Sequence, residues 1–222
     1  MFVALPIPAF DPARLQVLPR KFFNRDPRRV CRELLGKLLV RRHGRLFLAG
    51  RIVELEAYMG VNDPAAHASA GLTPRNRVLF GPPGYAYIYF IYGNHYCLNV
   101  SCMPEGNAGG VLFRALQPVA GIEQMEHARG LAGAAQTPRV LRLLASGPGR
   151  LAQAFGITRD RDNGKDLADP RSDLFLADDG WPPPRVLTTP RVGVTKAAGR
   201  PLRYLIAENE FVSPARLPAR AL

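Results

Sequence analysis

The stretch YAYIYFIYGNHY, residues 85–96, holds five of the seven tyrosines of this 222-residue chain. Side chains alternate along a β-strand, so Tyr85, Tyr87 and Tyr89 are expected on one face. A row of aromatic rings is what an enzyme acting on a stacked nucleic-acid base needs. Aromatic residues are also good strand formers. The run therefore predicts a strand, and it leaves open whether the rings bind a ligand.

A second dense segment, RIVELEAY at residues 51–58, reads as another strand. Glu54, Glu56 and Tyr58 would share one face of it. The two carboxylates would lie roughly 6.5 Å apart and point in parallel, whereas the paired carboxyls of O-glycosidases flank the scissile bond from two sides. A single carboxylate could instead serve as general base for a water, and a solvated strand face is the ordinary alternative. The pattern does not choose between Glu54 and Glu56.

The rest of the chain fits one α+β domain. Further strands are expected at the ranges 37–42, 46–58, 96–102, 110–116, 185–194, 201–206 and 211–213, and helices at 27–35, 118–129, 138–144 and 150–155. Strands and helices do not alternate as βαβ units, so we expect a mainly antiparallel, curved sheet with surrounding helices. Residues 1–20 are expected to form a flexible arm, and residues 21–222 the folded domain.

The charge favours a polyanionic partner. Lys and Arg number 30 against 18 Asp and Glu, which gives a net charge of +12, and such a balance is typical of proteins that bind nucleic acid or, second, anionic membranes. Only four of the basic residues are lysines, and codon bias can account for part of the arginine excess. The start of the chain lacks a basic signal-peptide region, and no apolar run reaches the length of a membrane span. We expect a cytoplasmic protein with no membrane partner.

Metal chemistry and disulfides are not expected. The three cysteines form no C-x-x-C pair, and the four histidines lack the spacing of zinc ligands. We therefore expect free thiols, no metal and no cofactor. Residues 51–114 contain no lysine, so this region cannot provide a lysine for Schiff-base cleavage, and glycosidic cleavage centred here should use water.

A long polar stretch, residues 59–84, separates the two dense segments. Loops of this length in compact domains are usually functional. Arg75 and Arg77 in this loop are candidates for contacts to the DNA backbone. His67 alone is a weak signal, because a lone histidine is more often a surface or packing residue.

Several motifs in one order carry a resemblance. They are RIVELEAY at 51–58, AH at 66–67, TPRN at 73–76, YIYFIYG at 87–93, CLNV at 97–100, LFRAL at 112–116, RVL at 139–141, SGP at 146–148 and PRVGV at 190–194. Together they closely resemble the alkyladenine (3-methyladenine) DNA glycosylase family, over roughly residues 20–213. The resemblance implies that residues 21–222 form a glycosylase domain.

The resemblance also implies a monofunctional enzyme that starts base-excision repair. Such an enzyme flips an alkylated or deaminated purine out of damaged double-stranded DNA and hydrolyses its N-glycosidic bond, as a monomer and without lyase activity. Glu56 would be the general base that activates water, which decides between the two glutamates, and Arg114 would help to hold that water.

Five further residues receive roles from the same resemblance. Tyr58, His67 and Tyr89 would line the base pocket. Tyr92 would be the wedge that enters the duplex where the base has left. Asn99 matches the position that excludes the exocyclic amine of guanine.

Two other functions remain open from the residues alone. One is a non-catalytic nucleic-acid-binding module in which Glu56 is structural. The other is a hydrolase of RNA or of free nucleosides. Alkylated purines carry a positive charge that an aromatic pocket stabilises by about 0.5–2 kcal/mol per contact, whereas a neutral lesion requires protonation, and no dedicated acid is evident in the sequence.

Overall fold

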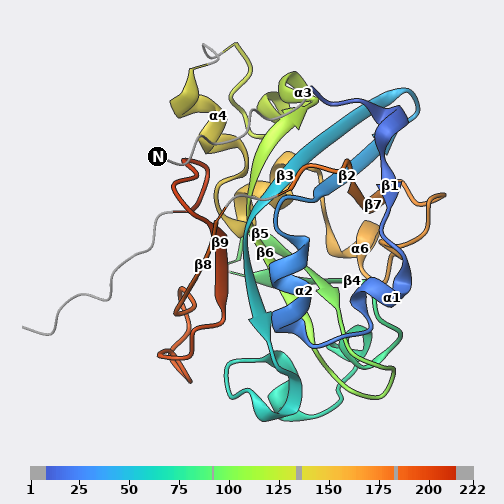
Figure 1. The fold of residues 1–222 in the computed structure, drawn as a ribbon, viewed down its shortest axis with the longest axis vertical. Helices are drawn as coiled ribbons and strands as arrows, with labels where there is room; N and C mark the ends of the chain where they lie inside the picture. Colours follow the sequence, from blue (N-terminus) through green and yellow to red (C-terminus); the bar gives the residue numbers. More distant parts are fainter. Residues whose placement is uncertain (1–8, 92, 134–136, 183–184, 214–222) are drawn as a thin grey trace, which may run out of the picture.

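The long strand β3 (Leu46–Tyr58) lies at the centre of a curled antiparallel sheet that forms half a barrel (Figure 1). The structure is a computed structural model and describes residues 9–91, 93–133, 137–182 and 185–213. Within this part of the chain, the strand order is β1-β7-β2-β3-β6-β5-β4, with β9 paired to β3 and β8 to β9. The other strands are β1 (Gln16–Val17), β2 (Leu38–His43), β4 (Ala86–Ile91), β5 (His95–Ser101), β6 (Gly110–Ala120), β7 (Leu174–Asp178), β8 (Val186–Thr189) and β9 (Arg203–Ile206).

Six short α-helices surround the sheet in the described residues. They are α1 (Arg20–Phe23), α2 (Pro27–Leu34), α3 (Ile122–Ala128), α4 (Pro138–Ala145), α5 (Pro148–Ala154) and α6 (Arg159–Asp162). Asp26 caps α2 by accepting a hydrogen bond from the Arg28 amide, and Pro27 occupies the first helical position, where its missing N–H is not needed. The expectation of a single α+β domain with a mainly antiparallel, curved sheet and surrounding helices is confirmed.

The main hydrophobic core joins the sheet to its helices. Val30 and Leu34 of α2 pack into the same buried cluster as Ile52 and Leu55 of β3 and Phe155 at the end of α5. Each of these side chains is completely or almost completely buried. Burying an aliphatic side chain of this size contributes about 1.5–3 kcal/mol, so this cluster fixes the position of β3 within the sheet.

Several elements differ from the sequence-based expectation, and the strands expected at 185–194 and 201–206 are shorter in the structure. β6 continues to Ala120, so the helix expected from residue 118 begins only at Ile122. Gly121 separates the two elements with φ of +72°, where an added Cβ would lie 2.7 Å from the Phe47 carbonyl oxygen. Residues 174–178 form a strand that the sequence did not predict because it follows a long charged segment, and residues 211–213 do not form the predicted strand.

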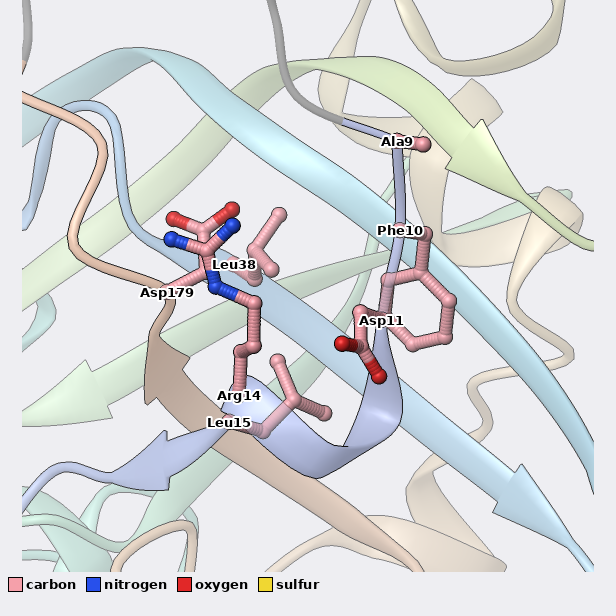
Figure 2. Close-up of a pocket in the computed structure, with 7 residues that line it drawn as sticks. All are labelled: Ala9, Phe10, Asp11, Arg14, Leu15, Leu38 and Asp179. Carbon is pink, nitrogen blue, oxygen red and sulfur yellow. The ribbon is translucent and has the colours of Figure 1, made fainter.

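Part of the arm expected over residues 1–20 packs on the sheet. Gln16 and Val17 pair with β7 and extend the sheet. Phe10 and Leu15 pack beside a second buried cluster that includes Leu38. Figure 2 shows this segment crossing the strands, where it forms a hollow with β2 and Asp179. The apolar residues of the arm pack against the surface of the folded sheet. A local sequence pattern does not reveal this contact, because the sheet comes from distant parts of the chain. Residues 1–8 lie outside the described residues.

A buried ion-pair cluster holds α6 and the following loop against β4. Arg41 of β2 and Asp162 of α6 are both fully buried, and Arg41 Nη2 donates to Asp162 Oδ2 at 2.7 Å. Lys165 donates to Asp162 at 2.8 Å and to Asp173 at 2.5 Å. Next to this cluster, the Ala86 amide donates to the Lys165 carbonyl, and the Ile88 amide donates to Asn163 Oδ1. The cluster therefore secures the outer edge of β4.

We expect Arg41→Met to lower the free energy of unfolding by about 3 kcal/mol, because breaking a buried ion pair leaves an uncompensated charge and Lys165 only partly compensates Asp162. Chemical denaturation measures the change. Arg171→Met is the matched control, since Arg171 is exposed and pairs with Asp169 in water, and it should leave stability nearly unchanged. Equal losses in the two variants would contradict a special role for the buried pair.

Candidate active site

Glu54 and Glu56 lie side by side on β3, and both are completely buried. They point away from the core formed by Leu55 and Ala57, as the strand alternation predicts. Tyr58 follows on the same face, and its hydroxyl donates to Glu56 Oε2 at 3.0 Å. The strand thus carries two buried carboxylates, an arrangement that requires positive partners.

A pair of β-bulges brings Arg114 of β6 to these carboxylates. Between Ile52 and Leu55 the register of β3 against β6 shifts twice, first by an extra residue in β3 and then by an extra residue, Arg114, in β6. Arg114 Nε donates to Glu54 Oε1 at 2.8 Å, and its Nη1 lies 3.3 Å from Glu56 Oε1. Bulges re-aim side chains next to functional sites, and this one directs a single guanidinium toward both glutamates.

The two glutamates have different surroundings. Glu54 accepts four hydrogen bonds, which come from Arg114, from Arg203, and from the backbone and the hydroxyl of Ser213. Glu56 accepts from the Val192 amide at 2.7 Å and from Tyr58. Burial raises the pKa of Glu56 above its ordinary value, although Arg114, the Val192 amide and Tyr58 act in the opposite direction. Such a carboxyl releases and takes up protons closer to neutral pH.

The segment at residues 190–192 closes one side of the site from a distant part of the chain. Arg191 forms a buried bidentate pair with Asp63, at 2.5 and 2.8 Å, and also donates to the Ala57 carbonyl. Its guanidinium lies 4.6 Å from the centre of the Tyr58 ring. Arg191 and Val192 were not predicted as site residues, although they belong to the quoted PRVGV motif. This segment fixes Tyr58 and supplies the amide that binds Glu56.

Three aromatic side chains form a second group. The ring of His67 contacts Tyr89 edge-on with 4.5 Å between ring centres, and Tyr87 lies 5.8 Å from Tyr89. His67 Nδ1 lies 2.9 Å from the Tyr87 hydroxyl oxygen. Burial and the nearby Arg75 lower the pKa of His67. The alternation of β4 predicted that Tyr87 and Tyr89 share a face, but not that Tyr87 would hold the His67 ring.

Tyr89 connects this aromatic group to the buried carboxylates. It lies opposite Cys97 in the ladder between β4 and β5. Burial raises the pKa of Tyr89, and nearby Cys97, Tyr58 and Glu56 raise it further. Burial also raises the pKa of Cys97 to about 11, so this thiol is protonated at neutral pH. Tyr89 therefore contacts His67 on one side and is close enough to Tyr58 and Glu56 to feel their charge.

Asn76 organises the loop that presents His67. Its amide nitrogen donates to the carbonyls of His67 and Gly71, and its oxygen accepts from the Thr73 amide. Asn76 is 2 % exposed, so these bonds are made out of water. Its signal in the sequence was the TPRN motif, but the bond to the His67 carbonyl, nine positions away, depends on how the loop folds.

Asn99 of β5 contacts the same aromatic group through the backbone. Its amide nitrogen donates to the Tyr87 carbonyl at 3.1 Å, and its side chain is almost completely buried. Asn99 lies directly opposite Tyr87 in the ladder. The tertiary structure thus brings the predicted residues Asn99, His67 and Tyr89 to one end of the β4–β5 pair.

A basic surface hollow of about 240 Å³ adjoins Tyr89. It is lined by Arg75, Ile88, Tyr89, Phe90 and Arg159. Arg75 and Arg159 are exposed and come from segments more than eighty residues apart. Arg159 was not predicted, because it stands in a charged stretch with no motif of its own.

Arg77 and Tyr92 are the two remaining predicted site residues. Arg77 begins a short 3-10 helix, Arg77–Phe80, is exposed, and does not line the hollow. Tyr92, the expected wedge, lies outside the described residues. Its neighbour Phe90 is 47 % exposed and packs against Tyr96 with 5.0 Å between ring centres. The β4–β5 hairpin therefore presents the aromatic side chain of Phe90 to solvent.

In the described ranges, no helix is long and apolar enough to cross a membrane. The same residues contain no group of three or more His, Cys, Asp or Glu side chains that could hold a metal ion. Cys31, Cys97 and Cys102 are buried free thiols.

The site thus combines a buried carboxylate, a group of aromatic rings and exposed arginines. Comparison with known proteins defines the class further. The family model for methylpurine-DNA glycosylase (MPG) matches residues 21–210. The chain therefore belongs to the methylpurine-DNA glycosylase family, whose members are hydrolases of N-glycosyl bonds in DNA. The resemblance found in the sequence is confirmed.

Individual relatives agree with this assignment. The chain is 62 % identical over 210 residues, 95 % of its length, to a protein of Koribacter versatilis named "Putative 3-methyladenine DNA glycosylase", of which 99 % is covered. Proteins with the same name from Methanoculleus marisnigri and Burkholderia cenocepacia are 48 % and 47 % identical. These alignments cover 88 % and 90 % of this chain, and 98 % and 92 % of the relatives.

We expect Arg75→Gln to raise the pKa of His67, because removal of a nearby positive charge favours the imidazolium. Titration of the histidine ring protons by NMR measures this shift. Arg77→Gln removes an exposed arginine of the same loop and should leave the His67 titration unchanged. An unchanged titration in Arg75→Gln, or equal shifts in the two variants, would show that Arg75 does not face the ring.

Proposed function

We propose that this protein is a monofunctional DNA glycosylase, which flips alkylated or deaminated purines out of duplex DNA and hydrolyses the N-glycosidic bond with a water activated by Glu56. The observation that carries the proposal is the environment of Glu56. This carboxylate is buried, held at both oxygens, and adjacent to Tyr58 and Tyr89. It can accept a proton from a water beside a base that stacks on the two rings.

The reaction needs few groups from the protein. The water oxygen forms a bond to C1′ of the sugar as the bond from C1′ to the purine nitrogen breaks, and the water proton passes to Glu56. The electron pair of the broken bond neutralises the positive charge of an alkylated purine, which leaves as a neutral base. Arg114, 3.3 Å from Glu56 Oε1, balances the carboxylate charge and helps to orient the water.

Glu54 is the less suitable base on physical grounds. Its Oε1 already accepts from Arg114, Arg203 and the Ser213 hydroxyl, and its Oε2 accepts from the Ser213 amide. A carboxylate engaged by four donors has little capacity left for a water. Glu56 has fewer donors and a raised pKa, which favours it as the general base.

The aromatic group would bind the flipped base. Tyr58, His67 and Tyr89 would line the pocket, with an alkylated purine stabilised against the ring faces by cation–π attraction. Because burial and Arg75 lower the pKa of His67, its ring is neutral at physiological pH and does not repel a cationic base. Asn99 would face the purine edge and exclude the exocyclic amine of guanine.

The hollow beside Tyr89 suggests where the DNA backbone would lie. Arg75 and Arg159 line this hollow from two segments, and exposed guanidiniums bind phosphates well. Arg77 would contact the backbone further along the loop. Tyr92 would enter the duplex as the wedge, next to the exposed Phe90.

The proposal extends to how the protein works in the cell. It would act as a monomer on damaged double-stranded DNA in the cytoplasm, without a cofactor or metal. The absence of lyase activity is supported by the lack of any lysine between residues 51 and 114, the region that carries Glu56, the aromatic group and Arg114.

We expect Glu56→Gln to lower base release from alkylated duplex DNA by about 10²–10⁴-fold, the usual contribution of a general base. Gln can still accept from Val192 and contact Tyr58, so affinity for the lesion should remain. Single-turnover assays of released 3-methyladenine measure the rate. In the wild type, the rate should fall as pH falls through the raised pKa of Glu56, above the ordinary glutamate value of about 4.3. Glu126→Gln, at a buried glutamate of α3, is the control.

The same assay separates the alternatives. Release of free 3-methyladenine from duplex DNA supports the proposal. Binding without release would favour a non-catalytic nucleic-acid-binding module. Preference for RNA or free nucleosides would favour the second alternative, and normal release by Glu56→Gln would refute the mechanism.

We expect Arg75→Gln and Arg159→Gln each to reduce the salt dependence of DNA affinity by about one unit of slope, because each removes one phosphate contact. The affinity for an abasic-site duplex between about 50 and 200 mM salt measures this slope. Arg45→Gln is the matched control, since this exposed arginine lies in the β2–β3 turn, at the other end of β3 from Tyr58. A loss in Arg45→Gln equal to the losses in the two variants would contradict a backbone path through the hollow.

A further inference from the structure

A cluster of buried polar groups stands behind Glu56 and does not take part in the reaction as proposed. Its members are Glu54, Arg203 and Ser213, from two strands and the segment after β9. Arg203 Nε donates to Glu54 Oε1 at 2.7 Å, and Arg203 Nη2 donates to the Ser213 carbonyl at 3.2 Å. Each of the three is at most 5 % exposed, and both oxygens of Glu54 are occupied by donors from Arg203, Ser213 and Arg114.

The cluster holds one side of the Arg114 guanidinium. Arg114 Nε donates to Glu54, and its Nη2 donates to the Ser213 hydroxyl at 3.4 Å. Only Nη1 remains directed at Glu56. Two carboxylates and two guanidiniums are thus buried together, and their formal charges cancel.

This balance depends on Arg203. With Arg203 present, Glu54 has a cation of its own, and Arg114 is shared between the two glutamates. Without Arg203, the buried group would carry one net negative charge, and Arg114 would be drawn to Glu54 as its only cationic partner. Glu56 would then lose part of its cation and face an uncompensated like charge, both of which favour its protonated form.

We propose that Arg203 and Ser213 are positioning residues for Glu56. By binding Glu54, they leave the Arg114 guanidinium shared between Glu54 and Glu56. They thereby set the pH range in which Glu56 can act as a base. The inference rests on the proposed role of Glu56. It assigns a positioning task to residues 203 and 213, which lie more than 140 positions from Glu56 in the sequence.

Other charged and titratable groups around Glu56 remain unchanged in this comparison. They are Tyr58 and Glu54 on β3, Arg114 on β6, Arg191 with its partner Asp63, Tyr89 on β4, Cys97 on β5 and Cys31 on α2. Removal of Arg203 therefore changes one charge in an otherwise fixed set.

The test compares pH profiles of single-turnover base release. The acidic limb is the part of the profile in which the rate falls as the pH falls. In Arg203→Met, we expect this limb to move to higher pH by about one unit or more, the usual effect of a nearby charge. At pH values below the limb the rate should fall about tenfold, and it should recover as the pH rises, while affinity for an abasic-site duplex stays the same. Arg203→Lys keeps the charge and should restore most of the wild-type profile.

Two further variants keep the result interpretable. Ser213→Ala removes one donor without changing charge, and it should move the limb in the same direction by a smaller amount, even if Arg203→Met does not fold. Arg51→Met removes a buried arginine of β3 that pairs with Asp179, and it should lower stability without moving the limb.

Each outcome has one meaning. A limb that stays in place in Arg203→Met and Ser213→Ala, with a uniform loss of rate or stability, would overturn the positioning role. If Glu56→Gln retained normal base release, the proposed function itself would fail, and the limb could not be assigned to Glu56. Loss of activity in Glu56→Gln together with an unmoved limb in Arg203→Met would reject the inference alone.

Discussion

The burial of two carboxylates on one strand is the constraint on which this structure depends. A buried carboxylate without partners costs several kcal/mol, so Glu54 and Glu56 must be surrounded by donors from other elements. Arg114 reaches them through a bulge in β6, Arg203 reaches Glu54 from β9, and Val192 supplies an amide to Glu56. The site therefore forms only when β6, β9 and the segment at 190–192 close around β3.

The aromatic side of the site depends on an edge strand. An unprotected edge of a sheet tends to pair with other chains, and here the loop after α6 covers β4 through Asn163 and Lys165. The buried pair of Arg41 and Asp162 holds this loop in place. As a result, Tyr87 and Tyr89 lie on a fixed strand, and both contact the His67 ring.

The arginine excess serves two purposes that composition alone does not separate. Several arginines are buried in ion pairs within the fold, including Arg41, Arg51 and Arg191. Others, such as Arg75 and Arg159, are exposed beside an aromatic hollow. The internal pairs hold loops and strands in register, and the surplus positive charge lies at the surface, where it can attract a polyanion.

The sequence by itself determined most strands, the antiparallel α+β class and the shared face of Glu54, Glu56 and Tyr58, because these follow from a local period of two. It also identified the family, through motifs in a fixed order. The tertiary structure decided what each glutamate is bound to, that Tyr87 holds His67, that Asn76 ties the loop, and that Arg159, Arg191, Arg203 and Ser213 join the site. These contacts link residues up to 159 positions apart, and no local pattern encodes them, because they arise only when the curled sheet brings its strands and loops together.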